Sequence, residues 1–217
     1  MRHPILETIL RWLTVVLIVR VLITIVANYV DYFPPNFESL FLQGREATFA
    51  GAYRSAFYIH IFSGPVVLLN GLILLSAAFR RRKPGLHRIL GRIQVIILLV
   101  LMLPSAMVMS QHAFGGWGAG LSFLILSLNT GICAAIGVLQ ARWHRYDLHR
   151  CWMLRTFVLI CSAVVLRLIS GAASVIGVEY PETAYIIAAW CSWLLPLATL
   201  EIVLRVPYFR TTQSEAK

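Results

Sequence analysis

Charged residues are scarce in this sequence, and acidic residues are the scarcest of them. Charged side chains make up 13% of the 217 residues and hydrophobic ones 59%, whereas a soluble domain carries about 25% charged residues. This composition predicts an integral membrane protein without a separate soluble domain. The net charge of +10 lies in short basic stretches between apolar segments, so we expect no nucleic-acid partner.

Several motifs of soluble enzymes are also missing. The chain has no Gly-rich phosphate loop, no His-Glu-x-x-His, no nucleophile elbow and no Cys-x-x-Cys-His site for covalent haem. The four cysteines match no zinc spacing and place no pair in an external loop. The sequence therefore leaves open whether the chain is an enzyme, and an oxidoreductase or electron carrier is the class we consider.

Apolar segments long enough to span a bilayer predict an all-α, polytopic fold with six transmembrane helices. The expected helices cover about residues 9–29, 55–79, 88–111, 119–140, 152–176 and 184–206. We expect a single membrane domain, residues 1–217, built on a four-helix bundle at about 55–176. Helices 9–29 and 184–206 flank that bundle.

Lysine and arginine gather on one side of the predicted helices, and acidic residues gather on the other. One side holds Arg80, Arg81, Arg82, Lys83, Arg88, Arg92, Arg142, Arg145, Arg150 and Arg155, with Arg2, Arg11, Arg205, Arg210 and Lys217 near the termini. The other side holds Asp31, Glu38, Glu46, Glu179 and Glu182 against Arg45 and Arg54. The positive-inside rule then predicts a bacterial plasma membrane protein with both termini cytoplasmic.

Four histidines fall near the ends of predicted helices, two on each side: His60 and His112 outside, His87 and His149 inside. Imidazoles in apolar helices hold a metal or haem, or move protons. At 100° per residue, one stripe of the third helix carries His87, Gly91, Gln94, Leu98, Ser105 and His112. Each pair could supply the axial ligands of a haem iron.

Other interpretations of these histidines stay open. His87 and His149 lie in arginine-rich stretches where they could be solvated or contact headgroups, and His112 could cap a turn. His60 lies deepest in apolar sequence, and small residues follow it at Gly64 and Gly71, so a flat macrocycle or a neighbouring helix could approach closely.

Polar residues within the helices add further candidates. Arg167 is expensive to bury without a partner, and we expect Arg155 and Arg167 to neutralise haem propionates or bind an anionic donor. Glu201 has Arg205 as its i,i+4 partner. The amides Asn70, Gln94 and Asn129 are interpreted as contacts between helices.

The motifs around three histidines resemble an uncharacterised family of bacterial predicted multi-pass membrane proteins. The matching segments are His60-Ile-Phe-Ser-Gly-Pro, His87-Arg-Ile-Leu-Gly-Arg and His149-Arg-Cys-Trp-Met-Leu-Arg, followed by Leu166-Arg167-Leu168. The resemblance covers about residues 55–176 and implies an architecture without an assigned activity.

A looser likeness is to the two-haem transmembrane b-type cytochromes that pass electrons from ascorbate. It implies four histidine ligands in a four-helix centre with a haem near each face. His87 and His149 match that helix usage. The outer pair departs from it, because the expected partner of His60 on the fourth helix is absent and His112 would have to replace it.

We therefore expect a membrane b-type cytochrome-like redox protein that binds haem b non-covalently through His60, His87, His112 and His149. Its partners would be the lipid bilayer and a quinone or small reductant. The alternatives are a transporter or channel for a proton or small anion, and an assembly or lipid-interacting subunit.

Overall fold

A computed structural model describes residues 4–39, 41–178 and 181–205. The chain forms two compact units, Met1–Ala50 and Gly51–Lys217. The described residues are helical apart from turns and one isolated bridge, Tyr32 to Pro35, so the predicted all-α fold is confirmed. The end of the last helix at 206 and the basic residues Arg2, Arg210 and Lys217 lie outside the described residues, as does Glu179.

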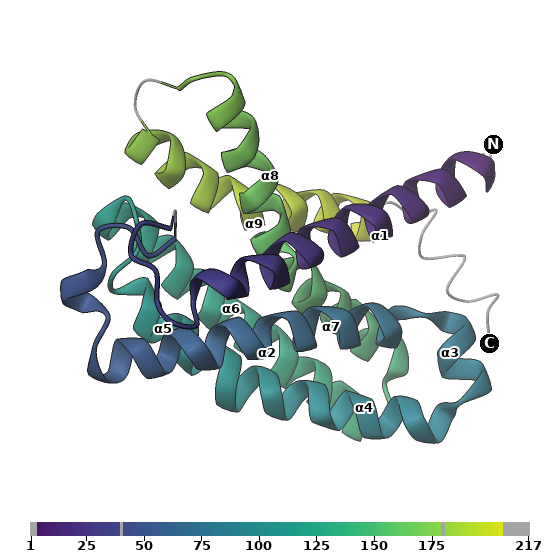
Figure 1. Ribbon diagram of the computed structural model, residues 1–217. Helices are drawn as coiled ribbons and strands as arrows, with labels where there is room; N and C mark the ends of the chain where they lie inside the picture. Colours follow the sequence, from purple (N-terminus) through teal and green to yellow (C-terminus); the bar gives the residue numbers. More distant parts are fainter. Residues whose placement is uncertain (1–3, 40, 179–180, 206–217) are drawn as a thin grey trace. The chain divides into compact units, whose positions relative to one another are not determined.

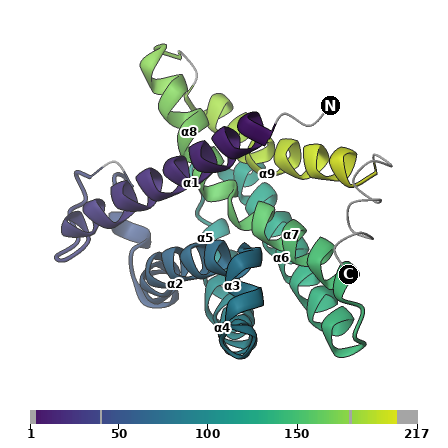
Figure 2. The same ribbon diagram turned by 90° about the vertical axis from the view of Figure 1, so that its right-hand side faces the viewer.

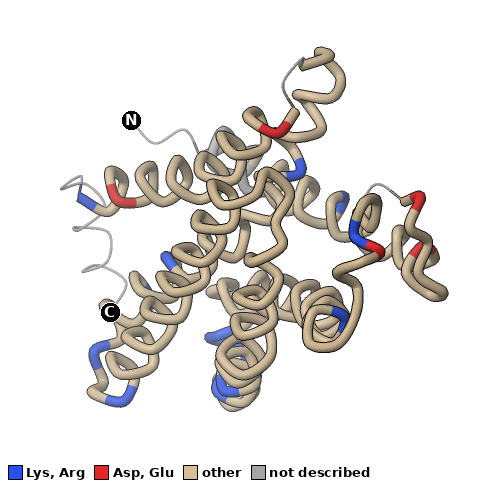
Figure 3. Tube along the Cα trace, turned by 90° about the vertical axis from the view of Figure 1, so that its left-hand side faces the viewer, with Lys and Arg blue, Asp and Glu red and all other residues tan. Residues whose placement is uncertain are grey.

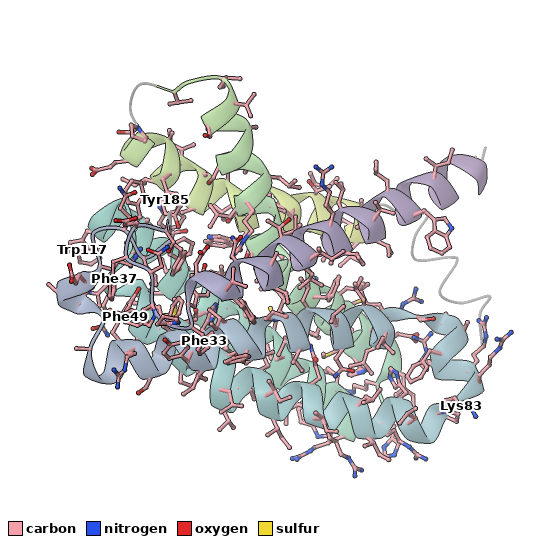
Figure 4. The ribbon with its side chains drawn as sticks, in the orientation of Figure 1. Phe33, Phe37, Phe49, Lys83, Trp117 and Tyr185 are labelled. Atoms are coloured by element: carbon pink, nitrogen blue, oxygen red, sulfur yellow. The ribbon has the colours of Figure 1, made fainter. Side chains whose placement is uncertain are left out.

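The first unit is one long helix followed by a loop ordered by aromatic rings. Its elements are α1 (Pro4–Ala27) and the short 3-10 helices η1 (Asn28–Asp31) and η2 (Glu46–Thr48). Phe37 meets Phe49 edge-on with ring centroids 5.7 Å apart, and both rings are labelled in Figure 4. Edge-to-face pairs of this kind stabilise a loop that lacks regular hydrogen bonding.

The second unit contains the remaining helices. They are α2 (Gly51–Leu75), α3 (Ala77–Arg82), α4 (Pro84–Ile96), the π-helical η3 (Ile97–Met102), α5 (Leu103–Ser110), α6 (Gly116–Arg142), α7 (Tyr146–Ile160), α8 (Ser162–Val175) and α9 (Pro181–Arg205). Because α4, η3 and α5 run on as one helix, and α7 and α8 as another, this unit has five helices that could span a membrane. With α1, the described residues have six such helices, as predicted.

Four of these helices close into a ring (Figures 1 and 2). Helix α2 packs against α4 and α5, α5 packs against α6, α6 packs along α7, and α7 returns to α2. Helix α9 packs outside the ring against α6, α7 and α8. The ring is the predicted four-helix core, and it holds all four candidate histidines.

Two glycines set how closely the ring can pack. A Cβ on Gly71 of α2 would lie 2.7 Å from the ring of Phe157 on α7. A Cβ on Gly120 of α6 would lie 2.5 Å from the carbonyl oxygen of Ser110, where α5 ends. Both distances are shorter than a carbon atom tolerates, so a side chain at Gly71 would displace the Phe157 ring, and one at Gly120 would displace backbone.

The second predicted helix ends earlier than expected, at Leu75 instead of residue 79. Ser76 has an extended backbone, and its hydroxyl accepts a hydrogen bond from the N–H of Phe79 at 3.2 Å. Serine in this role caps a new helix, so the chain turns into the basic helix α3 instead of continuing α2.

The third spanning helix contains a π-helical segment that the sequence analysis did not predict. The N–H of Leu103 donates to Leu98, five residues earlier, and Pro104 follows with no N–H to donate. Gln94, Leu98 and Ser105 are buried as the predicted stripe requires, and Leu103 is buried as well. His112 lies in the turn after α5 and is exposed, so the predicted stripe ends before His112.

Candidate functional site

The two ends of the four-helix ring differ in chemistry. Lysine and arginine gather where α3 meets α4 and where α6 meets α7 (Figure 3). In Figure 4, Lys83 marks this basic end, and the aromatic side chains of Trp117 and Tyr185 lie at the opposite end. We call these the basic end and the Gly51 end, after the residue that begins α2.

His149 at the basic end is held by a strong hydrogen bond to a neighbouring helix. Its Nδ1 lies 2.8 Å from the carbonyl oxygen of Gly137 on α6. A carbonyl oxygen only accepts, so Nδ1 carries the proton and donates. The other ring nitrogen, Nε2, then keeps its lone pair, which is the form of imidazole that binds a metal.

His87 occupies the equivalent place on another helix of the ring. It is the fourth residue of α4, as His149 is the fourth residue of α7. Each histidine therefore lies within the first helical turn, whereas the sequence analysis expected both to precede their helices. Both histidines of the predicted inner pair therefore lie at the basic end of the ring, each in the first turn of its helix.

Two polar atoms at this end are buried without a hydrogen-bond partner in the described part of the chain. They are Nδ1 of His87 and Oε1 of Gln140. Gln140 lies one turn beyond Gly137, whose carbonyl binds His149. Buried polar atoms are nearly always satisfied in folded proteins, so these two unsatisfied atoms mark a place for a bound group.

The residues at the basic end fit a haem better than a bare metal ion. No three histidine, cysteine or acidic side chains of the described residues come together as metal ligands, and a protein-held metal ion usually needs at least three. A haem needs only two axial ligands, because its macrocycle supplies the other four. Gly91, one turn after His87, has no atom within 4 Å of where a Cβ would be, which leaves room for a flat ring.

His60 is held more loosely, towards the Gly51 end. Its Nδ1 lies 3.4 Å from the carbonyl oxygen of Met102 and 3.4 Å from Oγ of Ser105. Both partners belong to the stretch where the π segment passes into α5. The hydroxyl of Ser105 donates to the carbonyls of Leu101 and Met102 at 2.7 and 2.9 Å, so the π segment and the serine together form the surroundings of this imidazole.

His112 lies in the turn after α5, where its ring meets Tyr53 edge-on at 5.2 Å. Tyr53 and His60 are both on α2 and seven residues apart, which corresponds to about 10 Å along a helix. The structure thus places His112 at the rim of the ring and His60 about two turns deeper. The two histidines of the predicted outer pair therefore lie at different depths.

Arg155 pairs with Glu201 across the α7–α9 contact. Nε and Nη2 of the guanidinium donate to the two carboxylate oxygens at 2.5 and 3.0 Å. The cation also lies 4.7 Å from the centre of the Trp152 ring. The prediction that Glu201 pairs with Arg205 along α9 is therefore wrong. A haem propionate would have to compete with Glu201 for Arg155.

Arg167 on α8 donates from Nη1 to the carbonyl oxygen of Ala163 at 3.0 Å. It lies 18 residues beyond His149 on the span formed by α7 and α8, or about 27 Å along the helix, so the second predicted anion-binding arginine is not near the inner pair.

The amides of Asn70 and Gln94 join α2 to α4 by hydrogen bonds, as predicted. Asn70 donates to the carbonyl oxygen of Leu90 and to Oε1 of Gln94 at 3.1 and 3.0 Å. Gln94 returns a hydrogen bond to the carbonyl oxygen of Val67 at 2.9 Å. This two-way bridge lies between the two histidine sites and fixes α2 against α4.

Sequence reasoning missed Gln140 and Gly137, and it placed Ser105 on the histidine stripe without assigning it a contact to His60. Gln140 carried a usable signal, because an amide in an apolar helix needs a partner. The role of Gly137 depends on a backbone oxygen, which every residue has, so no sequence pattern distinguishes it.

Comparison with known proteins gives a family and no activity. No curated protein and no solved structure matches the chain. The model of a family described as predicted membrane protein (DUF2306) matches residues 57–204, which include the whole four-helix ring except the start of α2. The chain thus belongs to this family of multi-pass membrane proteins, whose function is unknown.

Proposed function

We propose that the chain is a membrane b-type cytochrome-like redox protein in which His87 and His149 hold haem b at the basic end. The observation that carries the proposal is the hydrogen bond from Nδ1 of His149 to Gly137. It fixes the imidazole in the metal-binding tautomer and orients it through a rigid helix.

Several neighbouring features support the same assignment. His87 has an unsatisfied ring nitrogen and Gln140 an unsatisfied carbonyl oxygen, and the space beside Gly91 is open. Towards the middle of the ring, Phe157 and Gln94 fill the space beside Gly71. The macrocycle would therefore be confined to the basic end.

When bound, the haem would supply one-electron chemistry. The residues of this chain would hold and orient it: His149 through its anchored imidazole, His87 from another helix of the ring, and Gln140 by donating from its amide NH2 to a propionate. The apolar ring of helices would exclude water. The electron donor would be a quinol or small reductant.

We also propose a bacterial plasma membrane location, with the basic end on the cytoplasmic side. Single cysteines at Lys83 and Trp117, in a chain lacking its own four cysteines, would test the orientation in intact cells. A membrane-impermeant maleimide should label the Trp117→Cys variant and leave Lys83→Cys unlabelled until the cells are broken. The reverse labelling would invert the orientation.

A reduced-minus-oxidised visible spectrum of the purified protein, with a pyridine haemochrome assay, tests the cofactor. We expect a low-spin b-type spectrum with about one haem per chain, because the proposal assigns one histidine pair to the iron. His149→Leu and His87→Leu should each abolish that spectrum, and His112→Leu should keep it. A folded but colourless wild-type protein would refute the proposal.

A transport function is the second candidate, and the polar groups around His60 favour it. His60 and Ser105 lie within spanning helices, where polar side chains often mark the path of an ion or proton. A colourless protein that moves protons into liposomes, with flux lost in His60→Leu, would establish this function instead.

A further inference from the structure

Within the ring, His60 has the features of a ligand site that the haem assignment does not use. Its imidazole is half-buried, and Nδ1 is directed to the oxygens of Met102 and Ser105. Since the Met102 carbonyl oxygen only accepts, this arrangement places the ring proton on Nδ1. Nε2 is then a hydrogen-bond acceptor within an apolar helix.

The surroundings of His60 leave room for a flat group. Gly64, one turn further along α2, has no atom within 4 Å of where a Cβ would be. Phe57, one turn before His60, is fully buried. Residues at these spacings share one helix face, so open space and an aromatic wall lie on the same face as the imidazole.

The depth of His60 limits which ligands can reach it. It lies nine residues beyond Gly51, the start of α2, or about 13 Å along the helix. A lipid headgroup or a water-soluble reductant would have to leave its own phase to reach that depth. The exposed apolar side chains Ile59, Phe62 and Val66 lie on the other face of α2, so the helix that carries His60 borders the hydrocarbon of the bilayer.

We propose that His60 binds the hydroxyl of a lipid-soluble hydroquinone, whose ring lies over Gly64. A hydroquinone combines a flat apolar ring and tail, which partition to this depth, with a hydroxyl that donates to Nε2. Ser105 and the carbonyl of Met102 act as positioning groups, because they hold the proton on Nδ1. The inference rests on the proposed function, which requires a donor of electrons, and it assigns that donor to the bilayer.

Binding of decylubiquinol to the full chain in nanodiscs, kept anaerobic, tests the site. Saturation-transfer difference NMR gives the dissociation constant. His60→Leu should raise it about tenfold, the usual effect of one lost hydrogen bond. His112→Leu, at the rim, should leave it unchanged. Equal affinity in the wild type and His60→Leu, or equal loss in both variants, would overturn the proposal.

Two further variants separate ligand contact from folding. Gly64→Leu fills the open space beside the imidazole and leaves Met102 and Ser105 unchanged, and it should abolish binding while the protein unfolds at the wild-type temperature. Ser105→Ala should weaken binding about twofold to threefold, and Ser105→Thr should restore it. Ser127→Ala is the matched control, because Ser127 makes the same hydroxyl-to-backbone bond on α6. Normal binding in Gly64→Leu would contradict the assigned place of the ring.

Haem content measured in the same samples distinguishes this inference from the proposed function. Colourless protein that binds decylubiquinol through His60 would refute the haem and support the ligand site. Loss of haem in His60→Leu would make His60 an iron ligand and overturn the ligand site.

Discussion

The two ends of the four-helix ring hold a histidine in different ways. At the basic end, His149 makes a single 2.8 Å bond to Gly137, and nearby polar atoms are unsatisfied. Towards the Gly51 end, His60 divides its ring nitrogen between two acceptors at 3.4 Å. A short bond to a rigid helix suits a group that stays bound. A longer, shared bond suits a ligand that exchanges.

The packing between helices also differs between the two ends, and the more rigid contact lies at the end where the histidine is held more loosely. At the Gly51 end α5 and α6 meet through backbone, with the Ser110 carbonyl against Gly120. At the basic end α6 and α7 meet through a flexible side chain, because a Cβ on Gly137 would touch Sδ of Met153 at 2.8 Å. The loosely held His60 thus lies towards the end where two helices meet through backbone atoms. The firmly held His149 lies at the end where they meet through a flexible side chain.

Alanine at Gly120 should have the largest effect on stability. The added Cβ would meet a backbone oxygen that cannot rotate away, so we expect a loss of about 3 kcal/mol. Gly137→Ala should cost about 1 kcal/mol, since Met153 can change rotamer. Gly171→Ala, where no atom lies within 4 Å, is the control. Denaturant unfolding in mixed micelles measures all three, and a larger cost at Gly137 would reverse the comparison.

Breaking the Arg155–Glu201 pair should have the next largest effect on the free energy of unfolding. Glu201→Gln removes the charge that satisfies a partly buried guanidinium, and we expect a loss of about 2 kcal/mol. Glu182→Gln is the matched control, because Glu182 lies in the first turn of the same helix. The double variant Arg155→Met, Glu201→Gln should recover part of the loss. Equal costs at Glu182 and Glu201 would show that the pair contributes nothing.

Replacing either of two glutamines by leucine should change the free energy of unfolding slightly, and the two changes should have opposite signs. Gln94→Leu breaks the bridge to Asn70 and Val67, at about 1 kcal/mol. Gln140→Leu removes a buried oxygen that has no partner, so it should stabilise the haem-free protein by about 1 kcal/mol. It should also lower haem retention during dialysis, as expected where a binding site costs stability. Destabilisation by both variants would mean that Gln140 is satisfied in the folded protein.

Hydropathy and the spacing of basic residues were enough to predict six spanning helices and the four-helix core. Within the site they were enough to place His87 and His149 at the same end, since both begin a helix there. They could not predict that Arg155 pairs with Glu201, because the contact depends on how α7 is rotated against α9. They did place His60 deeper than His112, but a stripe drawn at 100° per residue could not predict that α5 ends at Ser110, before His112.

The π segment at Ile97–Met102 has a consequence for how such chains diverge. A turn closed over five residues in place of four is equivalent to a one-residue insertion into an α-helix. Deleting one residue there would leave a helix of the same hydrophobic character that still spans a bilayer. It would also rotate Ser105 by about 100°, away from His60. Length and hydrophobic character, which identify a membrane span, would therefore stay the same after a deletion that separates Ser105 from His60.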